Sequence, residues 1–332
     1  MTEPLLQISD LSTLFPGRQG PVAAVDGLDL SVGQAEVLGL VGESGCGKSM
    51  TALSVLGLVP PPGRVAGGQV LFEGRDLLTL TEPELRRVRG AGISMVFQEP
   101  MTSLNPVFTV GRQVAELVQA HCDVSPAAAM DLAVEMLGKV GVPEPRARAT
   151  AYPHQLSGGL RQRVMIAMAL TLNPPLVMAD EPTTALDVTI QAQILDLLRR
   201  LQADSGVSVL LITHNLAVVA QMAARVAVMY TGRLVEEAPV EELFRAPLHP
   251  YSQGLLACLP ARAPERGLRL PTIAGIVPAL DELPPGCKFS DRCPQRFAPC
   301  SEAEPALAEV APGRRVRCFL HHDQARQRRR AA

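Results

Sequence analysis

Residues 42–50 read GESGCGKSM, in which three glycines, a lysine and a serine have the spacing of a phosphate-binding loop. The first eight of these residues fit G-x-x-x-x-G-K-[ST], between a short apolar run and a helical pattern. Glycines let backbone N–H groups surround a polyphosphate, and the next helix directs its positive end at the same group. Lys48 is predicted to contact the β and γ phosphates, and Ser49 to bind Mg²⁺.

The alternative is a glycine-rich turn with an incidental lysine, which the strand before the motif and the helix after it disfavour. Cys46 occupies a variable position of the loop, and we interpret it as a filler rather than a reactive thiol. The whole stretch is predicted to contact nucleotide: Gly42, Glu43, Ser44, Gly45, Cys46, Gly47, Lys48, Ser49 and Met50.

The segment LVMADEP (176–182) is an apolar strand that ends in two carboxylates. Asp180 would hold the magnesium shell, and Glu181 would orient or deprotonate the attacking water. Taken alone, the pair is an ordinary acidic turn. Its position after a phosphate loop favours a role in hydrolysis.

The segment LSGGLRQR (156–163) presents Ser157, Gly158 and Gly159 just ahead of a helical pattern. A hydroxyl, bare amides and a helix N-terminus together make a second anion site. The alternative is a plain serine cap. Two anion sites in one chain indicate that two chains pair. In such a pair, the Ser-Gly-Gly tip of each chain would contact the nucleotide bound by the other chain.

The pattern around these motifs predicts an α/β protein. Residues 1–100 read as short strands and turns, and residues 110–172 as helices with apolar positions at i, i+3 and i+4. Two continuous apolar strands, 176–180 and 207–214, are separated by a helix, which is typical of a parallel sheet buried on both faces. A hairpin is predicted over 224–238.

The chain has 332 residues, 47% of them hydrophobic, and a net charge of −2, which excludes a disordered or nucleic-acid-coating protein. No apolar run reaches the roughly 18 residues of a membrane helix, and the N-terminus lacks a signal-peptide pattern. We therefore expect a cytoplasmic protein whose membrane role depends on partners. The basic tail RQRRR is interpreted as solvated, without nucleic-acid binding.

In their order along about residues 5–260, the motifs GESGCGKS, VFQEP, LSGGLRQR, LVMADEP, ALD and ITH resemble the ATP-binding cassette of ABC transporters. The resemblance implies a P-loop ATPase with an antiparallel β subdomain, and ATP and Mg²⁺ as cofactors. It places Phe15 on the adenine and His214 on the γ-phosphate. Gln98 would contact Mg²⁺ and water, and Asp187 would lie in the loop that crosses the dimer.

Three positions depart from the general pattern of this family. Met50 stands where threonine is frequent, Leu160 replaces the glutamine of the common LSGGQ, and Asn215 follows the histidine where aspartate is usual. None of them removes a group that the chemistry needs, so we expect an active ATPase. A non-catalytic subunit would lack Glu181 or His214, and both are present.

The segments FQEPMTSLNPVFTVGRQVAE, HPYSQGLLACLP and GIVPALDELPPGCKFSDRCP resemble the ATP-binding subunits of oligopeptide, dipeptide and nickel importers. Cys287, Cys293, Cys300 and Cys318 could together hold a [4Fe–4S] cluster or a zinc ion, or remain reduced thiols. The resemblance to peptide importers favours the iron–sulfur cluster.

We predict a cassette over residues 1–260, with a helical subdomain at about 101–172, and a small, irregular Pro- and Cys-rich extension over 261–332. The predicted function is ATP hydrolysis that powers peptide import by ATP-driven pairing of two cassettes. The implied partners are a second cassette (a copy or a related chain), two membrane-spanning subunits and an extracytoplasmic substrate-binding protein, at the cytoplasmic face of the membrane. The alternatives are a nickel or other small-solute importer, an exporter, and a soluble cassette ATPase acting on DNA or ribosomes.

Overall fold

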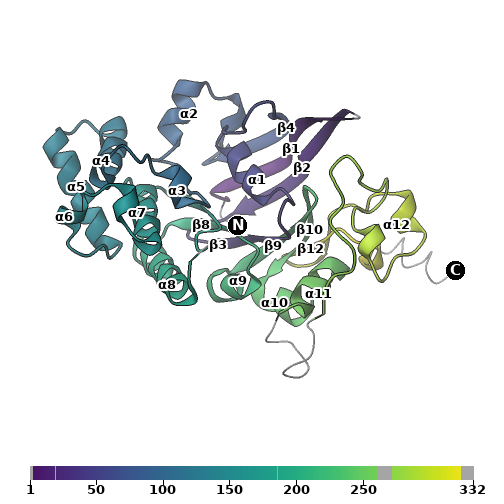
Figure 1. The fold of residues 1–332 in the computed structure, drawn as a ribbon. Helices are drawn as coiled ribbons and strands as arrows, with labels where there is room; N and C mark the ends of the chain where they lie inside the picture. Colours follow the sequence, from purple (N-terminus) through teal and green to yellow (C-terminus); the bar gives the residue numbers. More distant parts are fainter. Residues whose placement is uncertain (1–2, 19, 185, 260–270, 323–332) are drawn as a thin grey trace. The chain divides into compact units, whose positions relative to one another are not determined.

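The chain forms two compact units in a computed structural model (Figure 1). The first unit consists of Met1–Leu5, Val32–Val37 and Thr79–Ile212, and the second of Leu6–Ser31, Leu38–Leu78 and Thr213–Ala332. The structure describes residues 3–18, 20–184, 186–259 and 271–322. The predicted boundary near residue 260 lies outside the described residues.

A parallel sheet runs through the first unit. β7 (Leu176–Asp180) pairs in parallel with both β6 (Ile93–Val96) and β8 (Ser208–Thr213). Every residue of β7 and β8 is buried, which explains their continuous apolar sequences. The predicted parallel sheet is thereby confirmed for these strands, and the carboxyl end of β7 presents Asp180 and the following Glu181.

Helices make up most of the remaining first unit. Helices α4 and α5 pack through Val114, Val118 and Ala129, and both contact α7. Ser125 caps α5, because its hydroxyl accepts a hydrogen bond from the N–H of Ala128. The bounds are α2 (Glu82–Val88), α3 (Pro100–Ser103), α4 (Val110–His121), α5 (Pro126–Lys139), α6 (Pro145–Arg148), η2 (Pro153–Gln155), α7 (Gly158–Leu170) and α8 (Val188–Ser205).

Strands dominate the second unit. An antiparallel sheet has the order β2-β1-β4-β5, and β9 and β10 form the predicted hairpin, with β3 parallel to β9. The bounds are β1 (Leu6–Gly17), β2 (Gly20–Val32), β3 (Val37–Val41), β4 (Arg64–Phe72), β5 (Arg75–Asp76), β9 (Arg225–Tyr230), β10 (Arg233–Pro239), β11 (Ala308–Ala311) and β12 (Arg314–Val316).

The helices of the second unit are short. Across the ranges that the structure describes, each helix of the chain is too short or too polar to cross a bilayer. The bounds are α1 (Lys48–Val55), η1 (Leu77–Thr79), α9 (Leu216–Met222), α10 (Val240–Arg245), α11 (Pro250–Ala257), η4 (Ser290–Arg292), α12 (Pro299–Glu302) and η5 (Phe319–His321).

The C-terminal strands join the sheet of the second unit, which the sequence pattern did not predict. β12 pairs antiparallel with β10 and with β11. Its Arg315 donates to the carboxylate of Glu237 on β10, and Arg225 on β9 lies 2.7 Å from the same carboxylate. Glu237 is buried, and a buried carboxylate needs such partners. The segment after residue 300 is therefore less irregular than its sequence indicates.

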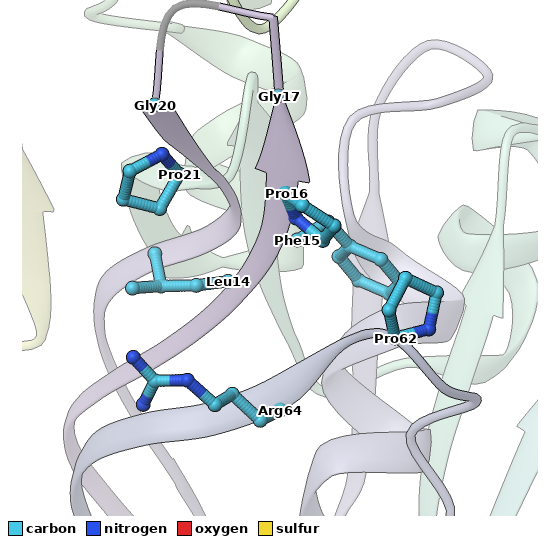
Figure 2. Close-up of a pocket in the computed structure, with 8 residues that line it drawn as sticks. All are labelled: Leu14, Phe15, Pro16, Gly17, Gly20, Pro21, Pro62 and Arg64. Atoms are coloured by element: carbon cyan, nitrogen blue, oxygen red, sulfur yellow. The ribbon is translucent and has the colours of Figure 1, made fainter.

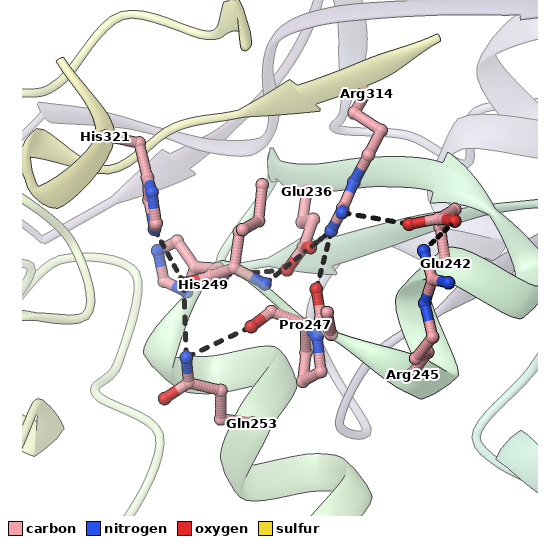
Figure 3. Close-up of polar contacts among 10 residues, drawn as sticks. Glu236, Glu242, Arg245, Pro247, His249, Gln253, Arg314 and His321 are labelled. Atoms are coloured by element: carbon pink, nitrogen blue, oxygen red, sulfur yellow. Dashed lines mark hydrogen bonds and ion pairs between the residues drawn. The ribbon is translucent and has the colours of Figure 1, made fainter. Parts of the chain in front are cut away.

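A second buried carboxylate, Glu236 of β10, organises the turn before α11 (Figure 3). It accepts hydrogen bonds from the backbone N–H groups of Leu248 and His249, both at 2.8 Å, and lies 3.7 Å from the guanidinium of Arg314. His249 is also buried, and its Nδ1 caps α11 by accepting from the N–H of Tyr251 at 3.0 Å. The turn thereby fixes Tyr251 in the interior of the second unit.

His249 should make folding stability depend on pH, because burial lowers its pKa to about 3 from 6.5. Below pH 6.5 the unfolded chain gains a proton on this residue that the folded chain gains only near pH 3, so the free energy of unfolding falls on acidification. Replacing it in His249→Asn keeps an acceptor for the Tyr251 N–H and removes the titration. Between pH 6.5 and 4 the wild type should lose roughly 3 kcal/mol more than the variant in urea titrations. Parallel pH profiles for the two proteins would contradict this assignment.

Candidate functional site

The predicted phosphate loop lies between β3, which is buried along its length, and α1, which begins at Lys48. Gly47 has a φ of 101°, in the left-handed region that favours glycine. A Cβ at Gly47 would lie 2.3 Å from the carbonyl oxygen of Ala24, and one at Gly42 would lie 2.2 Å from that of Met229. The loop is therefore a narrow cradle at which these two positions accept only glycine.

Lys48 is buried, and its ammonium group points back along this loop. Its Nζ donates to the carbonyl oxygens of Gly42 at 2.9 Å and Glu43 at 3.0 Å. Cys46 is buried beside it, and burial raises the pKa of this thiol, which fits its interpretation as a filler. A cation, a helix N-terminus and glycine amides at one loop fit the terminal phosphates of a nucleoside triphosphate.

Phe15, near the end of β1, lines a pocket of about 400 Å³ in the second unit (Figure 2). Its ring lies against Gly63, where a Cβ would come within 2.4 Å of the ring carbons. The other lining residues are Leu14, Pro16, Gly17, Gly20, Pro21, Pro62 and Arg64. The ring is half-buried, so a planar apolar surface remains available for stacking.

Glu181 and Gln98, two predicted catalytic residues, meet in the first unit. Oε2 of Glu181 accepts from Nε2 of Gln98 at 3.1 Å and from the hydroxyl of Thr184 at 2.7 Å. Glu181 has a φ of 46°, an uncommon value for a residue with a side chain. Asp180, one residue earlier, is buried at the end of β7. These two carboxylates thus have different surroundings, and the contacts of Glu181 fix where its oxygens point.

The predicted second anion site, Ser157 to Gly159, lies at the N-terminus of α7. Ser157 is its N-cap, and its hydroxyl accepts from the N–H of Leu160. Gly159 lies against Ile190 of α8, since a Cβ there would come within 2.8 Å of that side chain. Asp187 caps α8 by accepting from the N–H of Ile190 at 3.0 Å. Ser157, Gly158 and Asp187 are all exposed, as a surface that contacts another chain requires.

His214 follows β8 and belongs to the second unit, together with Phe15 and residues 42–50. Its ring is exposed. Asn215, which departs from the usual aspartate, caps α9 by accepting from the N–H of Ala217 at 3.0 Å. Asparagine serves this capping role as well as aspartate does, so the departure leaves the element intact.

Two family models match the chain: that of ABC transporters over residues 25–184, and that of the oligopeptide/dipeptide transporter C-terminal region over residues 235–300. A probable peptide ABC transporter ATP-binding protein of Sinorhizobium fredii is 52% identical over 320 residues, which is 96% of each chain. This chain belongs to the ABC transporter ATP-binding proteins.

Other relatives of this ABC ATP-binding protein match over almost the same length. An oligopeptide transport ATP-binding protein of Bacillus subtilis is 48% identical, over 96% of this chain and 98% of that one. A dipeptide transport ATP-binding protein of Escherichia coli is 46% identical, over 97% of this chain and 98% of that one. A solved dimeric cassette in a post-hydrolysis state with ADP and Pi is 27% identical, with a TM-score of 0.64 over 71% of this chain and 98% of that one.

The predicted iron–sulfur cluster is wrong. Among the described residues, which include Cys287, Cys293, Cys300 and Cys318, no group of three or more His, Cys, Asp or Glu side chains is arranged to hold a metal ion. Burial raises the pKa values of Cys287 and Cys318 to about 12. In these surroundings the protonated thiol is the favoured form of both side chains.

Two contacts of the ABC ATP-binding protein's phosphate loop were missed from the sequence. The hydroxyl of Tyr251 accepts from the N–H of Glu43 at 2.8 Å, and Arg292 donates to the carboxylate of Glu43. Both come from the C-terminal part of the chain, 208 and 249 residues after Glu43. No local pattern signals such a pairing, although the match of the C-terminal family model to residues 235–300 covers both side chains.

Proposed function

We propose that this chain is the ATP-hydrolysing subunit of a peptide importer. The observation that carries the proposal is the match of residues 235–300 to the oligopeptide/dipeptide transporter C-terminal region. A cassette alone does not identify a cargo, whereas this region is named for peptide transport. The end-to-end relatives from Sinorhizobium fredii, Bacillus subtilis and Escherichia coli bear peptide, oligopeptide and dipeptide names.

In this proposal ATP binds with its phosphates in residues 42–50 and its adenine on Phe15. Lys48 offsets charge on the β and γ phosphates. Ser49, Gln98 and Asp180 would hold Mg²⁺, and the ion would supply positive charge against the charge that develops on the γ-phosphoryl group. The glycine cradle, the buried ammonium group and the carboxylate at the end of β7 support this assignment.

Glu181 orients the attacking water and takes its proton, and His214 contacts the γ-phosphate. The hydrogen bonds that Glu181 accepts from Gln98 and Thr184 support a positioned carboxylate. Across the pair of cassettes, Ser157, Gly158 and Gly159 of one chain meet the γ-phosphate held by the other, and Asp187 lies at the crossing. The closed pair is stable with ATP and opens after hydrolysis.

The partners follow from this function. A second cassette pairs with this chain, two membrane-spanning subunits form the path for the peptide, and a substrate-binding protein delivers it from outside. The chain acts at the cytoplasmic face of the membrane. We also propose the division into a cassette at 1–260, with a helical subdomain at about 101–172, and a small Pro- and Cys-rich extension at 261–332.

The proposal is tested by uptake in cells that lack this chain and retain its membrane partners. Wild-type protein should restore uptake of a labelled di- or tripeptide. Lys48→Ala should restore less than about a tenth of it, because one charge-assisted phosphate contact is lost. Labelled nickel, measured in the same cells, addresses the alternative cargo. Restored nickel uptake without peptide uptake, or full peptide uptake with Lys48→Ala, would contradict the proposal.

A further inference from the structure

Glu43, the second residue of the phosphate loop, is held at each of its polar groups. Its N–H donates to the hydroxyl of Tyr251 at 2.8 Å, and its carbonyl oxygen accepts from Nζ of Lys48 at 3.0 Å. Its carboxylate accepts from both Nη atoms of Arg292, at 2.7 and 3.0 Å. Arg292 and Tyr251 therefore both contact Glu43, the residue whose carbonyl oxygen orients the ammonium group of Lys48.

Arg292 is itself fixed by its surroundings. Its side chain is 5% exposed, and its Nε donates to the carbonyl oxygen of Ala274 at 3.1 Å. The guanidinium carbon lies 5.8 Å from the ring centroid of Tyr230 and 5.9 Å from that of Phe289. A planar guanidinium that is packed on aromatic rings and paired through two bonds has little freedom to move. It is a rigid clamp on the loop rather than a surface ion pair.

The charge of Glu43 makes this clamp necessary. A carboxylate at the start of a loop that receives a polyphosphate repels the ligand, and its side chain is 28% exposed, so solvent screens it only partly. The guanidinium of Arg292 offsets that charge and fixes the carboxylate, while the Tyr251 hydroxyl holds the backbone N–H of the same residue. The same arrangement keeps the Glu43 carbonyl directed at the Lys48 ammonium.

We propose that Arg292, from the C-terminal part of the chain, is a positioning residue for nucleotide binding that acts through Glu43. This inference rests on the proposed ATP-binding function. Without Arg292, the loop keeps its sequence but carries an uncompensated carboxylate and a less constrained Glu43. The loss falls on ATP affinity rather than on the hydrolytic step, because the contacts of Arg292 are with the phosphate loop.

The test compares ATP binding by full-length variants in equilibrium dialysis with labelled ATP. Arg292→Gln should weaken ATP binding about tenfold, since it removes a bidentate charge-assisted pair. In ATPase assays its KM should rise by a similar factor, with kcat within about twofold of wild type. Adding Glu43→Gln to Arg292→Gln removes the uncompensated charge and should restore most of the affinity. Unchanged affinity in Arg292→Gln, or an unrestored double variant, would overturn the inference.

The matched control is Arg296→Gln, which loses the same charge from the same segment. Arg296 pairs with exposed Asp291 at 3.0 Å and is 48% exposed itself, so its loss should leave ATP affinity unchanged. An equal loss in this control would overturn the inference. If Arg292→Gln does not fold, Arg292→Lys decides. An ammonium group keeps the charge but cannot form the two parallel bonds of a guanidinium, so this variant should weaken ATP binding about threefold. Wild-type affinity in Arg292→Lys would then overturn it, whereas failure of wild type to bind ATP would instead refute the proposed function.

Discussion

Glu181→Gln should bind ATP with wild-type affinity and lose at least about 100-fold in the rate of hydrolysis, the usual effect of removing a general base. The amide preserves the size of the side chain and an oxygen that can accept from Thr184, so the local structure should persist. What it removes is the negative charge that draws a proton from water. Phosphate release at saturating ATP measures the rate, and equilibrium dialysis measures the affinity.

The control for this substitution is Glu135→Gln. Glu135 lies on α5 in an exposed ion pair with Lys139, and such pairs contribute about 1 kcal/mol or less to stability. The same change of charge at this position should leave hydrolysis unaltered. Undiminished hydrolysis in Glu181→Gln would contradict its assigned role, and an equal loss in the control would show that the effect is not specific to the site.

Local features of the fold followed from the sequence because they depend on short-range patterns. The continuous apolar segment 176–180 is the buried strand β7, and α4 begins at residue 110, where the predicted helical range 110–172 starts. Ser125 caps α5 through a bond to a residue three positions later. Glycines at 42 and 47 mark backbone that approaches other chain segments closely. Each of these depends on residues that are neighbours in the chain or on the space at one position.

Features that join distant segments did not follow from the sequence. The contact of Gln98 with Glu181 spans 83 residues, and that of Arg292 with Glu43 spans 249. The pairing of β12 with β10 depends on buried Glu237 and its arginine partners. The spacing of the cysteines did not reveal that burial raises the pKa values of Cys287, Cys293 and Cys318. Side-chain partners of this kind are set by the tertiary fold.

ATP should also drive two copies of this chain to pair, whereas ADP should not. The γ-phosphate is the group that a second anion site can reach from another chain, and ADP lacks it. Ser157 is exposed and is the N-cap of α7, so it can meet a phosphate without rearrangement. Ser157→Arg should block the approach of the partner by its bulk while leaving the chain's own phosphate loop intact. ATP binding should therefore survive in this variant and pairing should not.

Sedimentation velocity of the Glu181→Gln chain tests whether two chains bridge one triphosphate. With ATP and Mg²⁺ we expect a shift from one chain to two, and with ADP no shift. With Ser157→Arg added, we expect no shift at ATP concentrations that still saturate the site. A chain that saturates with ATP yet stays single both alone and when mixed with a related cassette, or one that pairs equally with ADP, would contradict this bridging.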